Sequence, residues 1–247
     1  MGNSEYWLRH FRQNLSQDTI DWEKEAYLSP DENQQVLKGL KAWQKGETSD
    51  GRHLLKAARR YAQKTGQADY VAAIQLFIKE EQKHGENLGI FIDRIGEERI
   101  EFDWGDALFR QVRYLFGSME IWTVTVLTVE SAAQLFYQSL QKGVESPLLK
   151  NICQDILHDE AYHLRFQQER LWEILSRRKP IFRLLSLGVY TLFFNTVARI
   201  IWLAHKPVFQ AGGLTRDEFL DRMTRRLERY FLVKPDFGWK IHLQAIN

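Results

Sequence analysis

Apolar residues recur at three- and four-residue intervals through most of the chain, as they do in helices that bury one face. The clearest case begins after Gly66, a residue that favours the end of a preceding helix, and runs to about Arg94. We predict one long helix over this stretch. Its apolar face carries Phe77, Ile78, Leu88, Phe91 and Ile92.

Three further long helices are predicted from the same spacing, over about 32–64, 105–142 and 146–178. Together with the helix that ends near Arg94, they make the four long helices of a bundle. The charged connection 95–104 joins the second and third of these helices.

The first of these helices has a well-defined start and a weak interior. Ser29 can cap it, Pro30 fits the first helical position, and Glu32 completes a capping box. Three glycines, Gly39, Gly46 and Gly51, interrupt it, and each lowers the local helix propensity. The polar stretch 48–50 could therefore cap a new helix at that point.

The chain is predicted to be a single domain over 1–247, with the bundle at 32–178 between two helical extensions. The N-terminal extension, 1–28, is expected to hold one or two short helices outside the bundle. The C-terminal extension, 181–247, ends in a helix that a capping box starts at Thr215 and that carries a basic face, expected to be solvated.

The stretch 181–204 is the most apolar part of the chain. A membrane span needs about 20 apolar residues with few or no charges, and Arg183, Asn195 and Arg199 interrupt this one. We therefore expect a fifth helix buried against the bundle. A helix lying on a membrane surface stays open as the alternative, because basic residues flank the stretch at Arg177, Arg178, Lys179 and Lys206.

Polar residues interrupt the predicted apolar faces at five positions. Glu81 and His84, three residues apart, lie side by side on the second long helix. Glu160 and His163 repeat this spacing on the fourth, and Glu130 stands among apolar residues on the third. An unpaired carboxylate in a dry core costs several kcal/mol. A bound metal ion would remove this cost and would explain the neighbouring imidazoles.

The spacing along each helical hairpin places these side chains at one height. Glu130 and Glu160 lie at similar distances from the predicted turn between their helices, so they should meet. Glu81 lies 81 − 66 = 15 residues after Gly66, so its partner on the first helix should lie near residue 51. Asp50 is closest in height, whereas Glu47 fits the apolar face better and has the longer side chain. We prefer Glu47 as the ligand and keep Asp50 as the alternative or as an outer group.

Two Glu-x-x-His helices and two helices with one carboxylate each form the di-metal site of ferritin-like bundles. In these residues the chain resembles the ferritin-like di-iron (di-metal) carboxylate superfamily, which includes ferritins, rubrerythrins, ribonucleotide reductase small subunits and di-iron oxygenases. The resemblance covers about 33–171 and implies an all-α fold, a ferritin-like four-helix bundle with additional N-terminal and C-terminal helices. The metal ligands that it implies are Glu47 or Asp50, Glu81, His84, Glu130, Glu160 and His163.

The charges of these ligands favour two divalent ions. Four carboxylates carry −4 and two neutral imidazoles carry none, so two divalent ions make the filled site neutral. Carboxylate and imidazole ligands without a thiolate suit iron or manganese. We expect two Fe ions, with Mn or a mixed Mn/Fe pair as alternatives. Asp159, four residues before His163, could accept the second N–H of that imidazole.

The composition of the chain excludes several other classes of protein and partner. The chain has 247 residues, 44% of them hydrophobic, and a net charge of +2, so no nucleic acid partner is indicated. Its single cysteine, Cys153, excludes a disulfide framework and a rubredoxin-type module within the chain. The N-terminal stretch lacks the apolar core of a signal peptide, so we expect a cytoplasmic location.

The resemblance implies an oxidoreductase that activates O2 at a buried metal pair and oxidises, hydroxylates or cleaves an organic substrate. The apolar residues expected around the site, including Phe77, Leu127 and Ile156, would suit a small hydrophobic one. Two alternatives remain: iron handling of the ferritin or rubrerythrin kind, and a non-catalytic metal-binding helical protein. The missing cysteines argue against a rubredoxin-bearing rubrerythrin. The sequence identifies neither the electron donor nor the oligomeric state, and a homodimer is left open.

Overall fold

The computed structural model of this protein describes residues 4–102 and 117–235. Within these ranges every regular element is an α-helix, so the predicted all-α class is confirmed. The segment 105–116, which we assigned to the start of the third long helix, lies outside the described residues. So does the end of the C-terminal extension, 236–247.

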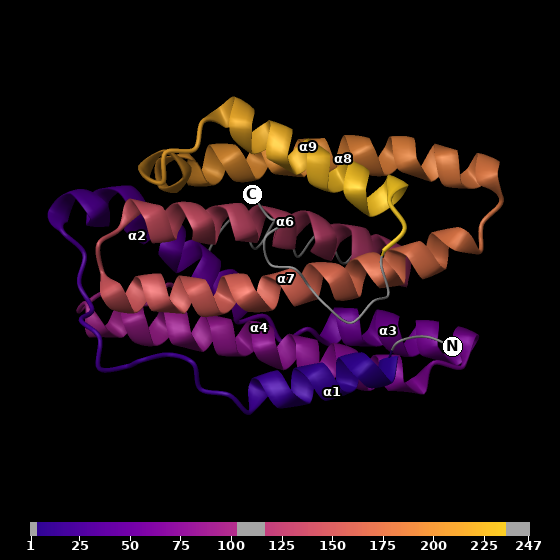
Figure 1. The fold of residues 1–247 in the computed structure, drawn as a ribbon, viewed down its shortest axis with the longest axis horizontal. Coiled ribbons are helices and arrows are strands. Elements are labelled where there is room, and N and C mark those ends of the chain that lie inside the picture. Colours follow the sequence, from indigo (N-terminus) through magenta and orange to yellow (C-terminus); the bar gives the residue numbers. More distant parts are fainter. Residues whose placement is uncertain (1–3, 103–116, 236–247) are drawn as a thin grey trace.

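Five helices make up the bundle: α2 (Pro30–Glu47), α3 (Arg52–Thr65), α4 (Ala68–Arg94), α6 (Met119–Gly143) and α7 (Pro147–Ser176). Helices α2 and α3 follow one another along α4, while α6 packs on α7. Contacts between α4 and α7 and between α3 and α6 join the two halves (Figure 1). This is the four-helix arrangement that the spacing of apolar residues predicted, with the first helix in two pieces.

The break between α2 and α3 has a local cause at Gly51. Its φ of +62° lies in the left-handed region, which side chains with a Cβ rarely adopt. A Cβ at Gly51 would also lie 2.5 Å from Cδ1 of Ile78 on α4. A single helix over 32–64 is therefore wrong, and the new helix start near 48–50 is correct. The Asp50 carboxylate accepts a hydrogen bond from the Arg52 backbone N–H at 3.1 Å, at the start of α3.

The predicted helix starts are confirmed in detail. Ser29 and Glu32 form a reciprocal capping box at α2. Ser146 accepts a hydrogen bond from the Leu149 backbone N–H at the start of α7. Each cap satisfies backbone N–H groups that a helix start otherwise leaves unpaired.

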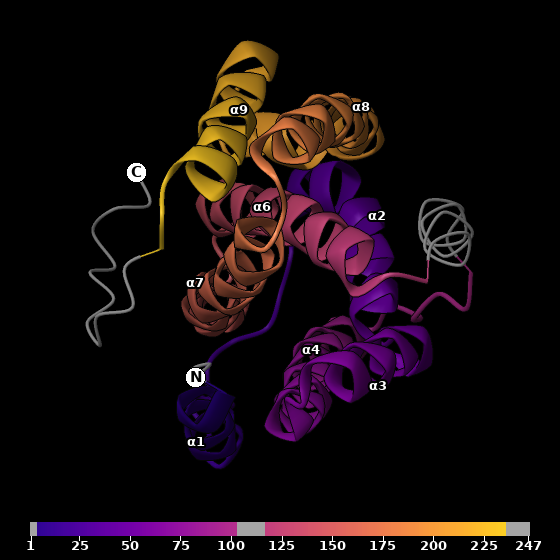
Figure 2. The ribbon, with the colours of Figure 1, turned by 90° about the vertical axis from the view of Figure 1, so that its right-hand side faces the viewer.

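Three outer helices cover opposite sides of the bundle. The N-terminal extension contains one helix, α1 (Ser4–Leu15), which packs on α4. On the other side, α8 (Pro180–Ala211) packs on α6 and α2, and α9 (Arg216–Leu232) packs on α8, α6 and α7. Figure 2 shows α8 and α9 as an outer layer over α6, with α1 at the far edge of the molecule.

Helix α8 only partly fulfils the expectation for 181–204. It packs on the bundle through one face, as expected, but most of its N-terminal half is exposed and not buried. By length and composition alone, α8 could cross a membrane, and 22% of its most apolar window is buried. Helices in the cores of soluble proteins pass the same test, so this property by itself is weak evidence.

Candidate metal centre

The bundle brings six of the seven predicted ligands together. Their ligand atoms form two groups, each within 4.8 Å, and both groups contain Glu81. The first group is Glu81, Glu130, Glu160 and His163, and the second is Glu47, Glu81 and His84. The four bundle positions, α2, α4, α6 and α7, each contribute at least one of these side chains.

Glu81 lies between the two imidazoles. Its Oε1 is 3.0 Å from Nδ1 of His163 and 3.9 Å from Nδ1 of His84. The same Nδ1 of His163 also lies 3.9 Å from Oε2 of Glu160 and 4.0 Å from Oε2 of Glu130. Both Nδ1 atoms therefore point toward the shared carboxylate. A group at this position could bridge two metal ions.

A close approach of α2 to α4 places Glu47 beside Glu81 and His84. A Cβ on Gly85 would lie 3.1 Å from Cβ of Glu47 and 2.9 Å from Cγ2 of Thr48. The absence of a side chain at Gly85 lets the end of α2 reach α4. Glu47 is the last residue of α2, and its side chain is buried.

Asp50, the alternative to Glu47, lies apart from both groups. Its carboxylate contacts the Arg52 side chain at 2.5 Å as well as the Arg52 backbone, and half of its side chain is exposed. The capping interaction at α3 uses the carboxylate that a metal ion would need. The geometry therefore favours Glu47 as the ligand from the first bundle helix.

Each imidazole is held from behind by a second carboxylate. Nε2 of His84 lies 2.9 Å from Asp159 on α7, and Nε2 of His163 lies 2.8 Å from Glu80 on α4. Asp159 thus pairs with the imidazole of the other helix, and our assignment of Asp159 to His163 is wrong. Such outer carboxylates fix the ring orientation and leave Nδ1 free to bind a metal ion.

One amide on α1 connects the two outer carboxylates. Nδ2 of Asn14 donates to Glu80 at 2.9 Å and to Asp159 at 2.8 Å. Sequence reasoning missed Asn14, although it lies on the same face of α1 as the buried Trp7 and Phe11, because the sequence does not show which bundle helix that face meets. The N-terminal helix therefore takes part in holding the centre.

Tyr137 on α6 contacts Glu47, a member of the second group of candidate ligands. Its hydroxyl donates to Glu47 Oε1 at 2.8 Å, and both side chains are buried. Burial and the adjacent Glu47 raise the pKa of Tyr137 well above its usual value, so the hydroxyl keeps its proton. It can therefore orient the carboxylate as a neutral donor.

The buried carboxylates resist ionisation in the absence of cations. Burial, and then repulsion from Glu81, raises the pKa of Glu47 to about 8. Burial and the neighbouring Glu130 raise the pKa of Glu160 well above its usual range. Burial alone would lower the pKa of His84, but its hydrogen bond to Asp159 raises it to about 9. The cluster therefore favours bound positive charge.

Several atoms that face the centre and could bind a metal ion have no aligned hydrogen-bond partner. Among the described residues, these buried atoms without an aligned hydrogen-bond partner include Oε1 of Glu81, both oxygens of Glu160, and Nδ1 of His84 and of His163, although Oε1 of Glu81 and Nδ1 of His163 lie 3.0 Å apart. Buried polar atoms are nearly always satisfied in native proteins. Atoms that are unpaired, buried and convergent fit two metal ions, and oxygen and imidazole donors suit iron or manganese.

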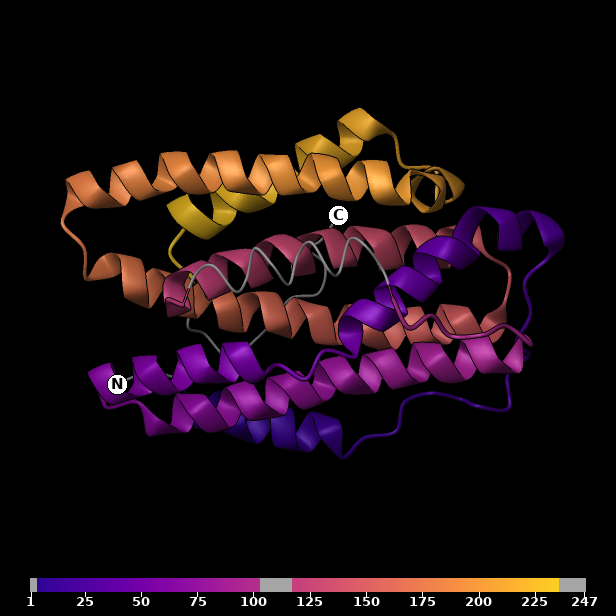
Figure 3. The ribbon, with the colours of Figure 1, turned by 180° about the vertical axis from the view of Figure 1, so that it is seen from behind.

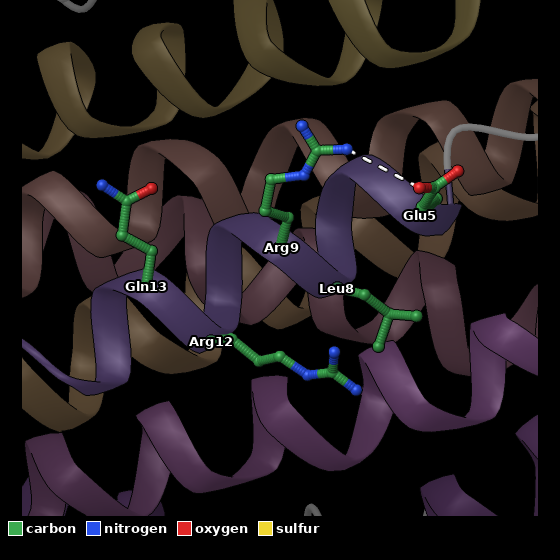
Figure 4. Close-up of a pocket in the computed structure, with 5 residues that line it drawn as sticks. All are labelled: Glu5, Leu8, Arg9, Arg12 and Gln13. Carbon is green, nitrogen blue, oxygen red and sulfur yellow. Dashed lines mark ion pairs between the residues drawn. The ribbon is translucent and has the colours of Figure 1, made fainter.

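A surface depression on α1 lies apart from these ligands. It is lined by Glu5, Leu8, Arg9, Arg12 and Gln13, all of them from α1 (Figure 4). Glu5 and Arg9 form an exposed ion pair across one helical turn, at 3.6 Å. None of the predicted ligands contributes to its wall, so it gives no indication of a route to the centre.

Comparisons with known proteins give matches of structure only. No protein-family model matches the chain, and no curated protein matches it. An R2-like ligand-binding oxidase without metal cofactor matches 93% of this chain and 96% of its own, with a TM-score of 0.65 and 14% identity. A point variant of an R2-like ligand-binding oxidase with an aerobically reconstituted Mn/Fe cofactor matches 93% and 92%, with a TM-score of 0.64 and 14% identity.

The chain therefore has the fold of the R2-like ligand-binding oxidases over nearly its whole length. These proteins belong to the ferritin-like di-metal carboxylate superfamily, so the resemblance that the two Glu-x-x-His motifs indicated is confirmed for the fold. The outer helices belong to this shared architecture, because the match extends far beyond 33–171.

A pair of isosteric variants distinguishes the two carboxylates on the first bundle helix. Glu47→Gln removes a donor that faces Glu81 and His84, so metal analysis should show the loss of about one ion per chain or an affinity at least about 100-fold lower. Asp50→Asn removes charge at the start of α3 and should leave the metal content unchanged. The opposite ranking in a metal titration would move the ligand to Asp50.

The metal-free protein should become less stable as pH rises. The pKa of Glu47 is about 8 in the folded protein, whereas the ordinary value for a glutamate is 4.5. The stability that its protonated form contributes is therefore lost as pH rises from about 4.5 to 8. The pKa of His84 is about 9 in the folded protein, against an ordinary value of 6.5. Its protonated form stabilises the fold fully below pH 6.5, and this stabilisation is lost as pH rises through 9. Thermal unfolding with chelator should therefore show stability falling by several kcal/mol between about pH 5 and pH 9.

Metal loading should remove this fall or reverse it, because protons compete with the ions for the same donors. Melting curves of the Mn(II)-loaded protein over the same pH range provide the comparison. A chelated protein that is more stable at the alkaline end would show that the carboxylates do not share one buried cluster.

Proposed function

We propose that this chain is a di-metal carboxylate oxidoreductase that holds two Fe or Mn ions and uses O2 as a co-substrate. The observation that carries the proposal is the convergence of buried donor atoms without partners on Glu81, Glu160, His84 and His163. Structures of the same fold carry a Mn/Fe cofactor, which supports two ions of this kind.

The proposed ligands divide between two adjacent sites. Glu130, Glu160 and His163 would hold one ion, Glu47 and His84 would hold the other, and Glu81 belongs to both groups of ligands. When bound, such a pair supplies the one-electron chemistry with O2 that protein side chains lack. Asp159 and Glu80 hold the imidazole N–H groups, and Tyr137 keeps its proton while it orients Glu47.

The substrate that we propose is a small apolar organic molecule. The Phe77 ring packs edge-on against the His163 ring, with centroids 4.7 Å apart, and Phe11 lies 6.1 Å from the same imidazole. Leu127 and Ile156 are buried on the two helices that carry Glu130 and Glu160. A polar substrate would lose its hydration among these side chains without gaining partners.

Iron handling is the weaker alternative. A storage shell needs compact bundles that pack against one another, whereas this chain covers one side of its bundle with α8 and α9. A purely structural role for the carboxylates is also disfavoured, because it leaves the Glu160 oxygens and two imidazole nitrogens buried without partners.

Oxygen consumption by the anaerobically Fe(II)-loaded protein tests the proposal. Adding O2 should give uptake at a rate well above free Fe(II), together with new absorbance from the oxidised centre. Glu130→Gln should lower the uptake at least about tenfold, because it removes charge from a ligand while keeping its shape. Glu228→Gln, the same change at an exposed position on α9, should have no effect.

Melting curves of Glu130→Gln separate a ligand from an ordinary buried residue. Burial raises the pKa of Glu130, so replacing it should leave the chelated protein unchanged or more stable. The metal-loaded form should melt at a lower temperature than the loaded wild type, since it loses binding energy. Equal losses in both forms, with the metal content intact, would make Glu130 a simple hydrogen-bonding residue and would remove the proposed site.

A further inference from the structure

Helix α8 presents two apolar faces, and only one of them is covered. Phe194, Ala198 and Trp202 are buried on the face that meets the bundle. Of the twelve exposed large hydrophobic residues among the described positions, eight lie on α8. These eight, which we call the outer stripe, are Ile181, Phe182, Leu184, Leu185, Val189, Leu192, Ile200 and Leu203.

The outer stripe is long, with Thr196 and Arg199 exposed between Leu192 and Ile200. From residue 181 to residue 203 it extends about 33 Å along the helix, at about 1.5 Å per residue. Figures 1 and 3 show α8 along one outer edge of the molecule, roughly parallel to the long axis of the bundle. An exposed apolar surface of this extent on a folded protein marks a site of contact with something else.

The end of α9 packs against the N-terminal half of α8. Arg183 donates to the backbone carbonyl of Phe231 at 3.2 Å, and the rings of Tyr190 and Phe231 lie 5.7 Å apart. These contacts bring the chain after Phe231 to the N-terminal half of α8. The next two residues, Leu232 and Val233, are also exposed.

The charge around the outer stripe has one sign. The segment 174–216 contains no Asp or Glu and seven basic residues. Two of these, Arg177 and Arg178, pair with Glu173 and Glu120. The other five are Lys179, Arg183, Arg199, Lys206 and Arg216, and within the described part of the chain none of them has an acidic partner.

Positive charge lies at both ends of the outer stripe and on it. Lys179 precedes its first residue, Lys206 follows its last, and Arg199 stands on the exposed side. An apolar helical face with a basic border is the arrangement by which helices lie in the plane of an anionic membrane. A second copy of the chain packed α8 to α8 would place basic residues against basic residues, because 174–216 contains no Asp or Glu.

We propose that the outer stripe docks this protein on an anionic lipid surface, with α8 lying in the interfacial plane. Helix α8 does not cross the bilayer in this arrangement, because its other face stays packed on α6 and α2. Apolar side chains enter the acyl boundary, and the basic residues contact the lipid phosphates. The docking is independent of the metal chemistry and places the bundle beside a pool of apolar molecules.

Vesicle sedimentation with the full-length Mn(II)-loaded protein tests the docking. Vesicles of phosphatidylcholine with about 30% phosphatidylglycerol should bind at least about tenfold more tightly than pure phosphatidylcholine. About 0.5 M salt should weaken this binding, because it screens the basic residues. Sodium carbonate should release the bound protein, since α8 does not span.

Paired variants assign the binding to the outer stripe. The double variant Leu185→Gln/Leu192→Gln should weaken vesicle binding about tenfold or more while leaving metal content and melting temperature unchanged. Phe102→Gln is the control, because Phe102 and Leu192 are equally exposed, at 71% each, and Phe102 lies outside the outer stripe. Lys179→Gln/Lys206→Gln should reduce the preference for anionic over neutral vesicles.

Four results would contradict the proposal. One is the absence of vesicle binding by the folded, metal-loaded protein, and another is binding that resists carbonate. The third is a concentration-dependent dimer in sedimentation equilibrium that Leu185→Gln/Leu192→Gln dissociates, which would assign the outer stripe to a second copy. An equal loss of vesicle binding in Phe102→Gln would also contradict the assignment.

Discussion

Mutual repulsion among carboxylates in the centre of one bundle is the constraint on which the rest of this structure depends. Glu130 and Glu160 are buried, and they share a cluster with Glu81 and His163. Burial raises the pKa of both glutamates, so their ionised forms are disfavoured without a compensating charge. Two divalent cations neutralise the cluster and satisfy its unpaired donors together. A hydrophobic bundle with this interior is more readily explained as the shell of a metal pair than as a plain core.

The surroundings of the cluster hold its imidazoles in one orientation. Asp159 and Glu80 each accept from an imidazole on the opposite helix, so α4 and α7 are cross-linked twice behind the centre. Burial would raise the pKa of Asp159, but hydrogen bonds from His158 and His84 hold it far below its usual value. Asn14 then ties both outer carboxylates to α1. The N-terminal helix is thus part of the support of the centre.

The sequence predicted the features that follow from short-range rules. Helix spacing, the capping residues and the phase of Glu-x-x-His against an apolar face are all local, and they gave the bundle and the positions that the structure brings together. Other features depend on contacts between distant segments. The crossing of Asp159 to His84, the reach of Asn14 and the close approach at Gly85 are of this kind. The exposed face of α8 was not predicted, because the sequence of an apolar helix has the same pattern whether one or both of its sides are buried.

Metal analysis of the chain after anaerobic loading with Fe(II) or Mn(II) and removal of loosely bound ions tests the central claim most directly. Six convergent ligands with one shared carboxylate predict two ions per chain, and a chelated sample should hold none. A loaded protein that retains its fold but binds fewer than one ion per chain would contradict the di-metal centre. The buried carboxylates would then need another source of compensating charge.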